Sequence, residues 1–88
     1  MQQFDMRMTI EPNMRIISEM IRLFNKFDSD VYIGKNNSGR YINAKSLLGV
    51  LSDYPHLMDI LNINVYGNCE VNDCMDIERE LKFILLKH

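Results

Sequence analysis

Few side chains in this 88-residue chain are of types that carry out chemistry. Its two histidines, His56 and His88, lie far apart in the sequence, and a lone loop histidine is more often solvated than catalytic. The cysteines, Cys69 and Cys74, are too few for a metal site, and cytoplasmic thiols stay reduced. The sequence contains no Ser/His/Asp arrangement, glycine-rich phosphate loop or metal-ligand cluster. We therefore expect two unpaired thiols, and no enzyme activity, metal or cofactor.

Ser46 is the remaining candidate for chemistry, because it precedes an apolar run at residues 47–51. A serine in that place is a good helix N-cap, worth about 1 kcal/mol. A phosphate added there meets free backbone N–H groups and the positive end of the helix dipole, so the fold should tolerate it. Lys45 adds a nearby positive charge. Both interpretations, a structural cap and a modification site, stay open.

Composition restricts the class of protein. The chain is 47% hydrophobic and 25% charged, with a net charge of −2 and scattered basic residues, which argues against nucleic acid binding. Asp5 and Arg7 interrupt the apolar start, so it is not a signal sequence, and the apolar run at 83–86 is too short to span a membrane. We expect one cytoplasmic domain covering residues 1–88, with no contact to membranes.

Apolar periodicity predicts the elements of the first half. Residues 3–10 alternate as a half-buried strand, which Pro12 ends. Residues 13–27 show helical spacing, with Asn13 as a plausible N-cap. A strand from Val31 and a strand at 40–44 form a hairpin around the turn signal at 36–39.

The second half completes the pattern. A short helix begins at Ser46 and ends before Pro55, and residues 59–67 form a strand with either Ile60 or Leu61 in phase with the core. A loop at 67–73 leads to a last helix that Asp73 can cap. The order β-α-β-β-α-β-α predicts an α+β open-faced β-sandwich, in which three helices cover one face of a mostly antiparallel four-stranded sheet. The same β-α-β-β-α-β order occurs in RNA-recognition domains, but the sequence has no RNP-like aromatic pair.

Several stretches resemble the HPr family, the phosphocarrier proteins of the bacterial phosphoenolpyruvate-dependent sugar phosphotransferase system. They are MQQ at the start, TI at 9–10, KFDSDV at 26–31 and, most specifically, INAKSLLGVLS at 42–52. The resemblance covers about the first two-thirds of the chain, since after Gly67 only the pattern of a final helix agrees. It implies the HPr-like open-faced β-sandwich.

The resemblance also implies that this chain lacks the phosphate-carrying histidine of the family. Family members carry a histidine at the start of the first helix, which takes a phosphoryl group from the first enzyme of the system and passes it to sugar-specific proteins. Counting back from residues 26–30 places Asn13 at that position, Arg15 where the family has arginine, and Ile16 where it has proline. An amide nitrogen cannot carry phosphate, because its lone pair is delocalised into the carbonyl. Neither His56 nor His88 is expected at that helix start.

Ser46 matches the serine that a dedicated ATP-dependent kinase phosphorylates in Gram-positive HPr proteins, whose phosphoserine form is a corepressor of a carbon-catabolite transcription regulator. By resemblance, Arg15 shares a face with a partner-binding patch that comprises Lys45, Leu47, Leu48 and Leu51, although these leucines can instead pack in the core. The sequence therefore predicts a regulatory or adaptor protein whose partners are HPr kinase, phosphotransferase enzymes or a transcription regulator. The alternative is a protein-protein interaction domain on the same fold, without phosphorylation and without a role in sugar transport.

Overall fold

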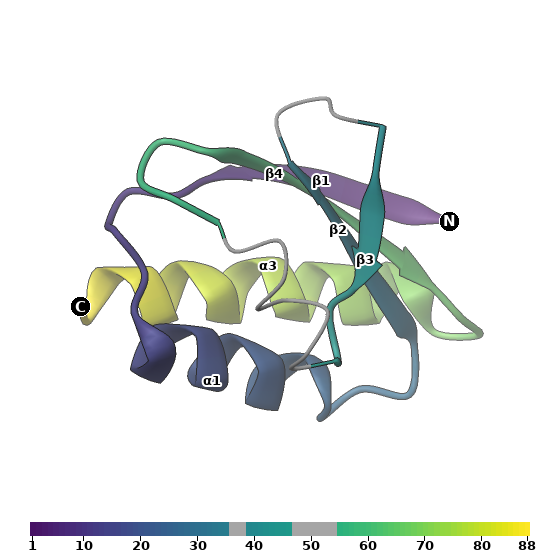
Figure 1. The fold of residues 1–88 in the computed structure, drawn as a ribbon. Helices are drawn as coiled ribbons and strands as arrows, with labels where there is room; N and C mark the ends of the chain where they lie inside the picture. Colours follow the sequence, from purple (N-terminus) through teal and green to yellow (C-terminus); the bar gives the residue numbers. More distant parts are fainter. Residues whose placement is uncertain (36–38, 47–54) are drawn as a thin grey trace.

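The structure, a computed structural model, describes residues 1–35, 39–46 and 55–88. Four strands form one sheet in the order β1-β4-β2-β3, and every pairing in it is antiparallel (Figure 1). The short helix expected from Ser46 to residue 54 falls on residues that are not described beyond Ser46 itself. The elements are β1 (Gln2–Arg7), α1 (Met14–Phe24), β2 (Asp30–Lys35), β3 (Tyr41–Asn43), β4 (Ile60–Tyr66) and α3 (Glu70–Leu86).

Both described helices, α1 and α3, lie on the same side of the sheet, as Figure 1 shows, and no helix of the described residues covers the other side. The predicted α+β open-faced sandwich is therefore confirmed. The core lies between the sheet and the helices, where Met8, Ile17, Phe24, Ile63 and Leu81 are fully buried. Burying side chains of this size contributes about 2 kcal/mol each, which is how a chain of this length holds its elements together.

The predicted alternation of the first strand is confirmed on its inner face, where Met6 and Met8 are buried. The strand itself ends at Arg7, earlier than the expected residue 10. Met8 still forms backbone hydrogen bonds of 2.8 Å with Met58 and Asp59, so the antiparallel pairing of β1 and β4 continues beyond the end of β1.

Burial shows which side chains of the strand at 60–66 face the core. Leu61, Ile63 and Val65 have no exposed surface, whereas Ile60 is 41% exposed. Ile60 is thus on the open face of the sheet, and Leu61 is the core residue. Asn64 is also buried, although it points to the open face, because it lies between neighbours on β1 and β2.

The last helix differs from the expectation. α3 begins at Glu70, with Cys69 at the N-cap position, so the predicted loop over residues 67–73 is wrong and Asp73 is not the cap. Asp73 lies in the first turn of α3, where its carboxylate accepts a 2.6 Å hydrogen bond from the Ser29 hydroxyl. The buried face carries Cys74, Ile77, Leu81 and Leu85, and Met75 is exposed. On the exposed side of α3, the Lys82 ammonium lies 3.6 Å from the Glu78 carboxylate, one turn earlier.

Candidate functional site

Asn13 caps the N-terminus of α1, as predicted. Its side-chain Oδ1 accepts a 3.0 Å hydrogen bond from the backbone N–H of Ile16, and its own backbone is extended. This bond satisfies one of the N–H groups that a helix start leaves unpaired. Arg15 follows on the exposed side of the first turn. The position that the resemblance assigns to a phosphate-carrying histidine is therefore filled by a capping amide.

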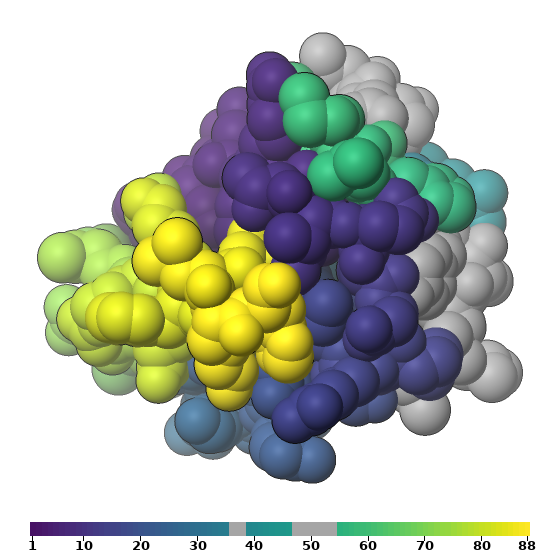
Figure 2. Space-filling model, turned by 90° about the vertical axis from the view of Figure 1, so that its left-hand side faces the viewer, coloured from purple at the N-terminus to yellow at the C-terminus, as the bar shows by residue number. Residues whose placement is uncertain are grey.

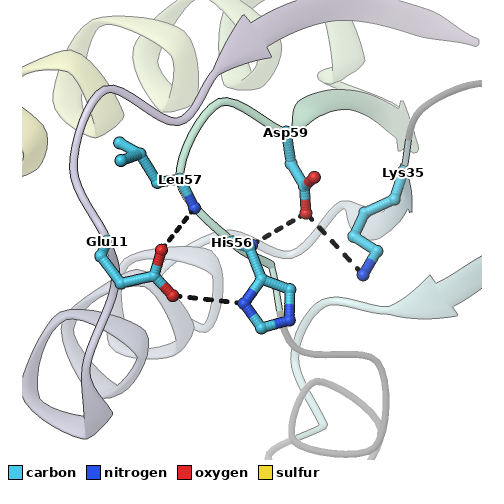
Figure 3. A network of polar contacts seen from close by, with 5 residues as sticks. All are labelled: Glu11, Lys35, His56, Leu57 and Asp59. Atoms are coloured by element: carbon cyan, nitrogen blue, oxygen red, sulfur yellow. Dashed lines mark hydrogen bonds and ion pairs between the residues drawn. The ribbon is translucent and has the colours of Figure 1, made fainter.

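A polar network joins this loop to the segment before β4 (Figure 3). The Glu11 carboxylate accepts a 2.7 Å hydrogen bond from the Leu57 backbone N–H and lies 3.2 Å from Nδ1 of His56. Asp59 accepts a 2.8 Å hydrogen bond from the His56 backbone N–H and lies 3.8 Å from the Lys35 ammonium. The network brings His56 to the loop that leads into α1, which the sequence did not predict.

The electrostatics of the network favour a charged Glu11. The hydrogen bond from Leu57 and then the contact with His56 hold the pKa of the Glu11 carboxyl below its ordinary value. The side chains of Glu11 and His56 are 57% and 64% exposed, so solvent screens the pair.

His88 contacts the middle of α1 and not its start. Its Nε2 lies 2.8 Å from the Glu19 carboxylate, and the Lys87 ammonium lies 3.4 Å from the other oxygen of that carboxylate. The contact with His88 is the main cause that lowers the pKa of Glu19. These contacts tie the end of α3 to α1, so His88 has a structural role here.

Ser46 follows a turn at the end of β3, where its backbone N–H donates a 3.1 Å hydrogen bond to the Asn43 carbonyl. The preceding Lys45 is directed towards the end of α1. Its ammonium donates a 2.6 Å hydrogen bond to the Phe27 carbonyl, and Asn25 contacts its backbone oxygen at 3.5 Å. The Ser46 side chain is half-buried. Lys45 thus anchors the turn that presents Ser46.

The two candidate positions lie at opposite ends of α1. Asn13 precedes its first residue, whereas Lys45 contacts Asn25 and Phe27 just beyond its last residue. A helix of 11 residues is about 16 Å long, so Asn13 and the Lys45 turn do not form one compact site. The leucines expected beside Ser46 in the patch, Leu47, Leu48 and Leu51, lie outside the described residues. Whether Arg15 shares a face with that patch stays a prediction.

The thiols are unpaired, as expected: Cys69 is exposed and Cys74 is buried, and this burial raises the pKa of Cys74. Within residues 1–35, 39–46 and 55–88, no three His, Cys, Asp or Glu side chains gather as metal ligands. Over the same ranges, none of the helices has the length and apolar character to cross a membrane.

Aromatic side chains gather on the open face of the sheet, which sequence reasoning missed. Tyr32 and Tyr66 meet edge to face with ring centroids 5.9 Å apart. The ring of Tyr41 lies over Gly34, and its hydroxyl donates a 2.6 Å hydrogen bond to Asn62. Strand alternation places these residues on one face once the pairing register of the strands is known. The sequence did not reveal that register, so the grouping could not be predicted.

The comparisons with known proteins support the fold. No protein-family model matches the sequence, and no curated protein matches it. The solved structures that match include HPr-C-His from Thermoanaerobacter tengcongensis, with a TM-score of 0.84, 17% identity and coverage of 97% of this chain and 96% of that one. The histidine-containing phosphocarrier protein of Mycoplasma matches with a TM-score of 0.79, 20% identity and coverage of 96% and 97%.

A third structure is Crh of Bacillus subtilis, described as a catabolite repression containing protein that forms a swapped dimer. It matches with a TM-score of 0.62, 19% identity and coverage of 96% of this chain and 94% of that one. The chain therefore has the HPr fold, along nearly its whole length. At these identities the likeness establishes the architecture, and the fold that the sequence resemblance implied is confirmed.

Proposed function

We propose that this chain is a divergent HPr-like protein that does not carry phosphate on histidine and acts as a cytoplasmic regulator or adaptor, switched by phosphorylation of Ser46. The observation that carries the proposal is the N-cap of α1. Asn13 Oδ1 is engaged by the Ile16 N–H at 3.0 Å. A phosphocarrier needs a nucleophilic lone pair that can attack and later leave, which imidazole supplies and an amide does not.

The surroundings of Ser46 support its role as the modified residue. Two hydrogen bonds fix the turn that presents it: the Lys45 N–H donates to Asn43 Oδ1, and the Ser46 N–H donates to the Asn43 carbonyl. The Lys45 ammonium also contacts the Phe27 carbonyl, just beyond α1. A kinase can therefore meet the serine on a preformed turn. The Lys45 ammonium, now on the Phe27 carbonyl, is close enough in sequence to turn towards a phosphate on the next residue.

No enzymatic role is part of the proposal. The partners we expect are proteins: an HPr kinase, enzymes of the phosphotransferase system or a transcription regulator. The likeness to Crh favours a regulatory partner, because that protein is described as a catabolite repression protein. A patch made of Lys45, Leu47, Leu48 and Leu51, with Arg15, is the surface we propose for them.

The test is phosphorylation by HPr kinase with ATP, followed by intact-mass spectrometry. We expect one phosphate on the wild-type chain and none on Ser46→Ala. Ser52→Ala is the matched control, because it removes a second serine of the same segment and should still be phosphorylated. Ser46→Asp, which adds a negative charge at the same position, should then change partner binding in the same direction as phosphorylation does.

Absence of phosphate on the wild-type chain, under conditions that modify a Gram-positive HPr protein, would contradict the regulatory proposal. The chain would then be a protein-protein interaction domain that has kept the HPr fold without a role in sugar transport. A phosphate that persists in Ser46→Ala and disappears in Ser52→Ala would show that the kinase modifies Ser52, and would contradict the assignment to Ser46.

A further inference from the structure

α3 carries a stripe of exposed apolar side chains on the side away from the core. Helical periodicity places these side chains around Arg79, opposite the buried face that contains Ile77 and Leu81. In Figure 2, α3 (green to yellow) forms the left-hand part of the molecule, with α1 (dark blue) on its right. We call these residues the α3 outer stripe: Val71, Met75, Phe83 and Leu86, which are 53%, 64%, 63% and 80% exposed.

The stripe borders a hollow and not a flat surface. A groove of about 440 Å³ runs along this face of α3, lined by apolar side chains at its ends and by charged ones between them. Several large exposed apolar side chains on one face of a small protein often mark an interaction site, because they cost solubility and contribute nothing to the core. The groove is lined by Met75, Glu78, Arg79, Lys82, Phe83 and Leu86.

The spacing of the stripe is nearly symmetric. Met75 lies four residues before Arg79 and Phe83 lies four residues after it, and Val71 and Leu86 each lie about one turn further out. A second α3 that packs antiparallel, with a two-fold axis at Arg79, therefore sets Met75 of one copy beside Phe83 of the other. Such thioether–aromatic contacts are favourable, and a two-fold interface requires this kind of self-complementarity.

The charges on the same face match this arrangement. Glu78 and Lys82 lie on one flank of the stripe, where they form a weak pair within the helix at 3.6 Å. Antiparallel packing brings Lys82 of each copy to Glu78 of the other, and so makes two pairs across the interface. Arg79, at the axis, is held at 2.9 Å by Asp76 of its own chain, which offsets the like charges there.

We propose that the α3 outer stripe is the interface of a homodimer in which two copies of α3 pack antiparallel about Arg79. A helix of 17 residues is about 25 Å long, and a single helix pair of this length lies at the small end of specific interfaces. The dimer is therefore concentration-dependent. This interface is separate from the Asn13 and Ser46 regions, so the test does not depend on the function proposed above.

The test is sedimentation equilibrium over a wide range of protein concentrations. We expect the wild-type chain to dimerise. Lys82→Glu and Glu78→Lys should each weaken the dimer about tenfold or more, because each sets like charges against one another across the interface. An equimolar mixture of the two variants should form heterodimers at least as stable as the wild-type dimer, since every cross-pair then has opposite charges.

Phe83→Asp should abolish the dimer, whereas Leu57→Asp, which changes an exposed side chain outside the stripe, should leave it unchanged. Circular dichroism of each variant confirms that it is folded. A wild-type chain that stays monomeric at millimolar concentration would overturn the proposal. So would a dimer that persists in Phe83→Asp, or two single-charge variants that fail to associate when mixed.

Discussion

The Glu11 carboxylate lies 3.2 Å from Nδ1 of His56, a residue 45 positions away, and closes the loop before α1 against the segment before β4. The pKa of Glu11 is lowered by its hydrogen bond from Leu57 and by His56. A carboxylate with a lowered folded pKa stabilises the protein above its ordinary pKa of about 4.5, and this contribution is lost as the pH falls through the folded value.

Glu11→Gln should therefore lower the free energy of unfolding at pH 7, by a small amount because the group is exposed and screened. The difference between wild type and Glu11→Gln should shrink towards zero as the pH falls below 4.5, where the wild-type carboxylate becomes protonated. Urea denaturation across this pH range measures the difference in the free energy of unfolding, and added salt should reduce this difference at pH 7. A difference that stays constant with pH would contradict the assigned role of Glu11.

The N-cap of α1 gives a second prediction. Asn13→Ala removes the acceptor of the Ile16 N–H and should cost about 1 kcal/mol of stability. Asn13→Ser keeps a capping oxygen and should cost much less. Thermal or urea denaturation compares the two variants. Equal stabilities for alanine and serine would show that capping is not what Asn13 contributes.

Gly34 and Tyr41 give a third prediction. A Cβ on Gly34 would lie 2.8 Å from a ring carbon of Tyr41, whose hydroxyl is held by Asn62 at 2.6 Å. Gly34→Ala should therefore displace the ring and destabilise the fold by about 1 kcal/mol. In a Tyr41→Ser background the same change should be neutral or stabilising, because alanine restricts the unfolded chain. A cost that is equal in both backgrounds would exclude the steric explanation.

The hydrogen bond between Ser29 and Asp73 gives a fourth prediction. Ser29 is 3% exposed, and its hydroxyl donates to the Asp73 carboxylate at 2.6 Å, joining the loop after α1 to the first turn of α3. Ser29→Ala should cost about 1–2 kcal/mol, because the carboxylate loses a buried donor. Ser18→Ala, on the exposed side of α1, is the control and should change little. Comparable stabilities for the two variants would show that the bond contributes little.

The sequence predicted most of the fold because its signals are local. Alternation identified the inner face of β1, and helical spacing together with Asn13 identified α1. The start of α3 was missed because Asp73, a good capping residue in isolation, is engaged by Ser29 from another part of the chain. The phase at Ile60 and Leu61 could not be decided because both residues are apolar, and only pairing with β1 and β2 separates them.

The candidate site was predicted in part. Asn13 was expected to cap the helix, and it does so. His56 was not expected at the start of α1, and the structure places it on Glu11, in the loop two residues before Asn13. No local pattern could reveal this contact, because it depends on how the segment before β4 packs against the end of β1.

The central claim, that this HPr fold does not carry phosphohistidine, is tested most directly with phosphoenolpyruvate and the first enzyme of the phosphotransferase system. Intact-mass spectrometry at neutral pH then detects any acid-labile phosphate, with a histidine-containing HPr protein as the positive control. We predict no phosphate on this chain. An acid-labile phosphate that is lost in His56→Gln, and kept in His88→Gln, would contradict the claim and show that the histidine beside Glu11 replaces the one absent at Asn13.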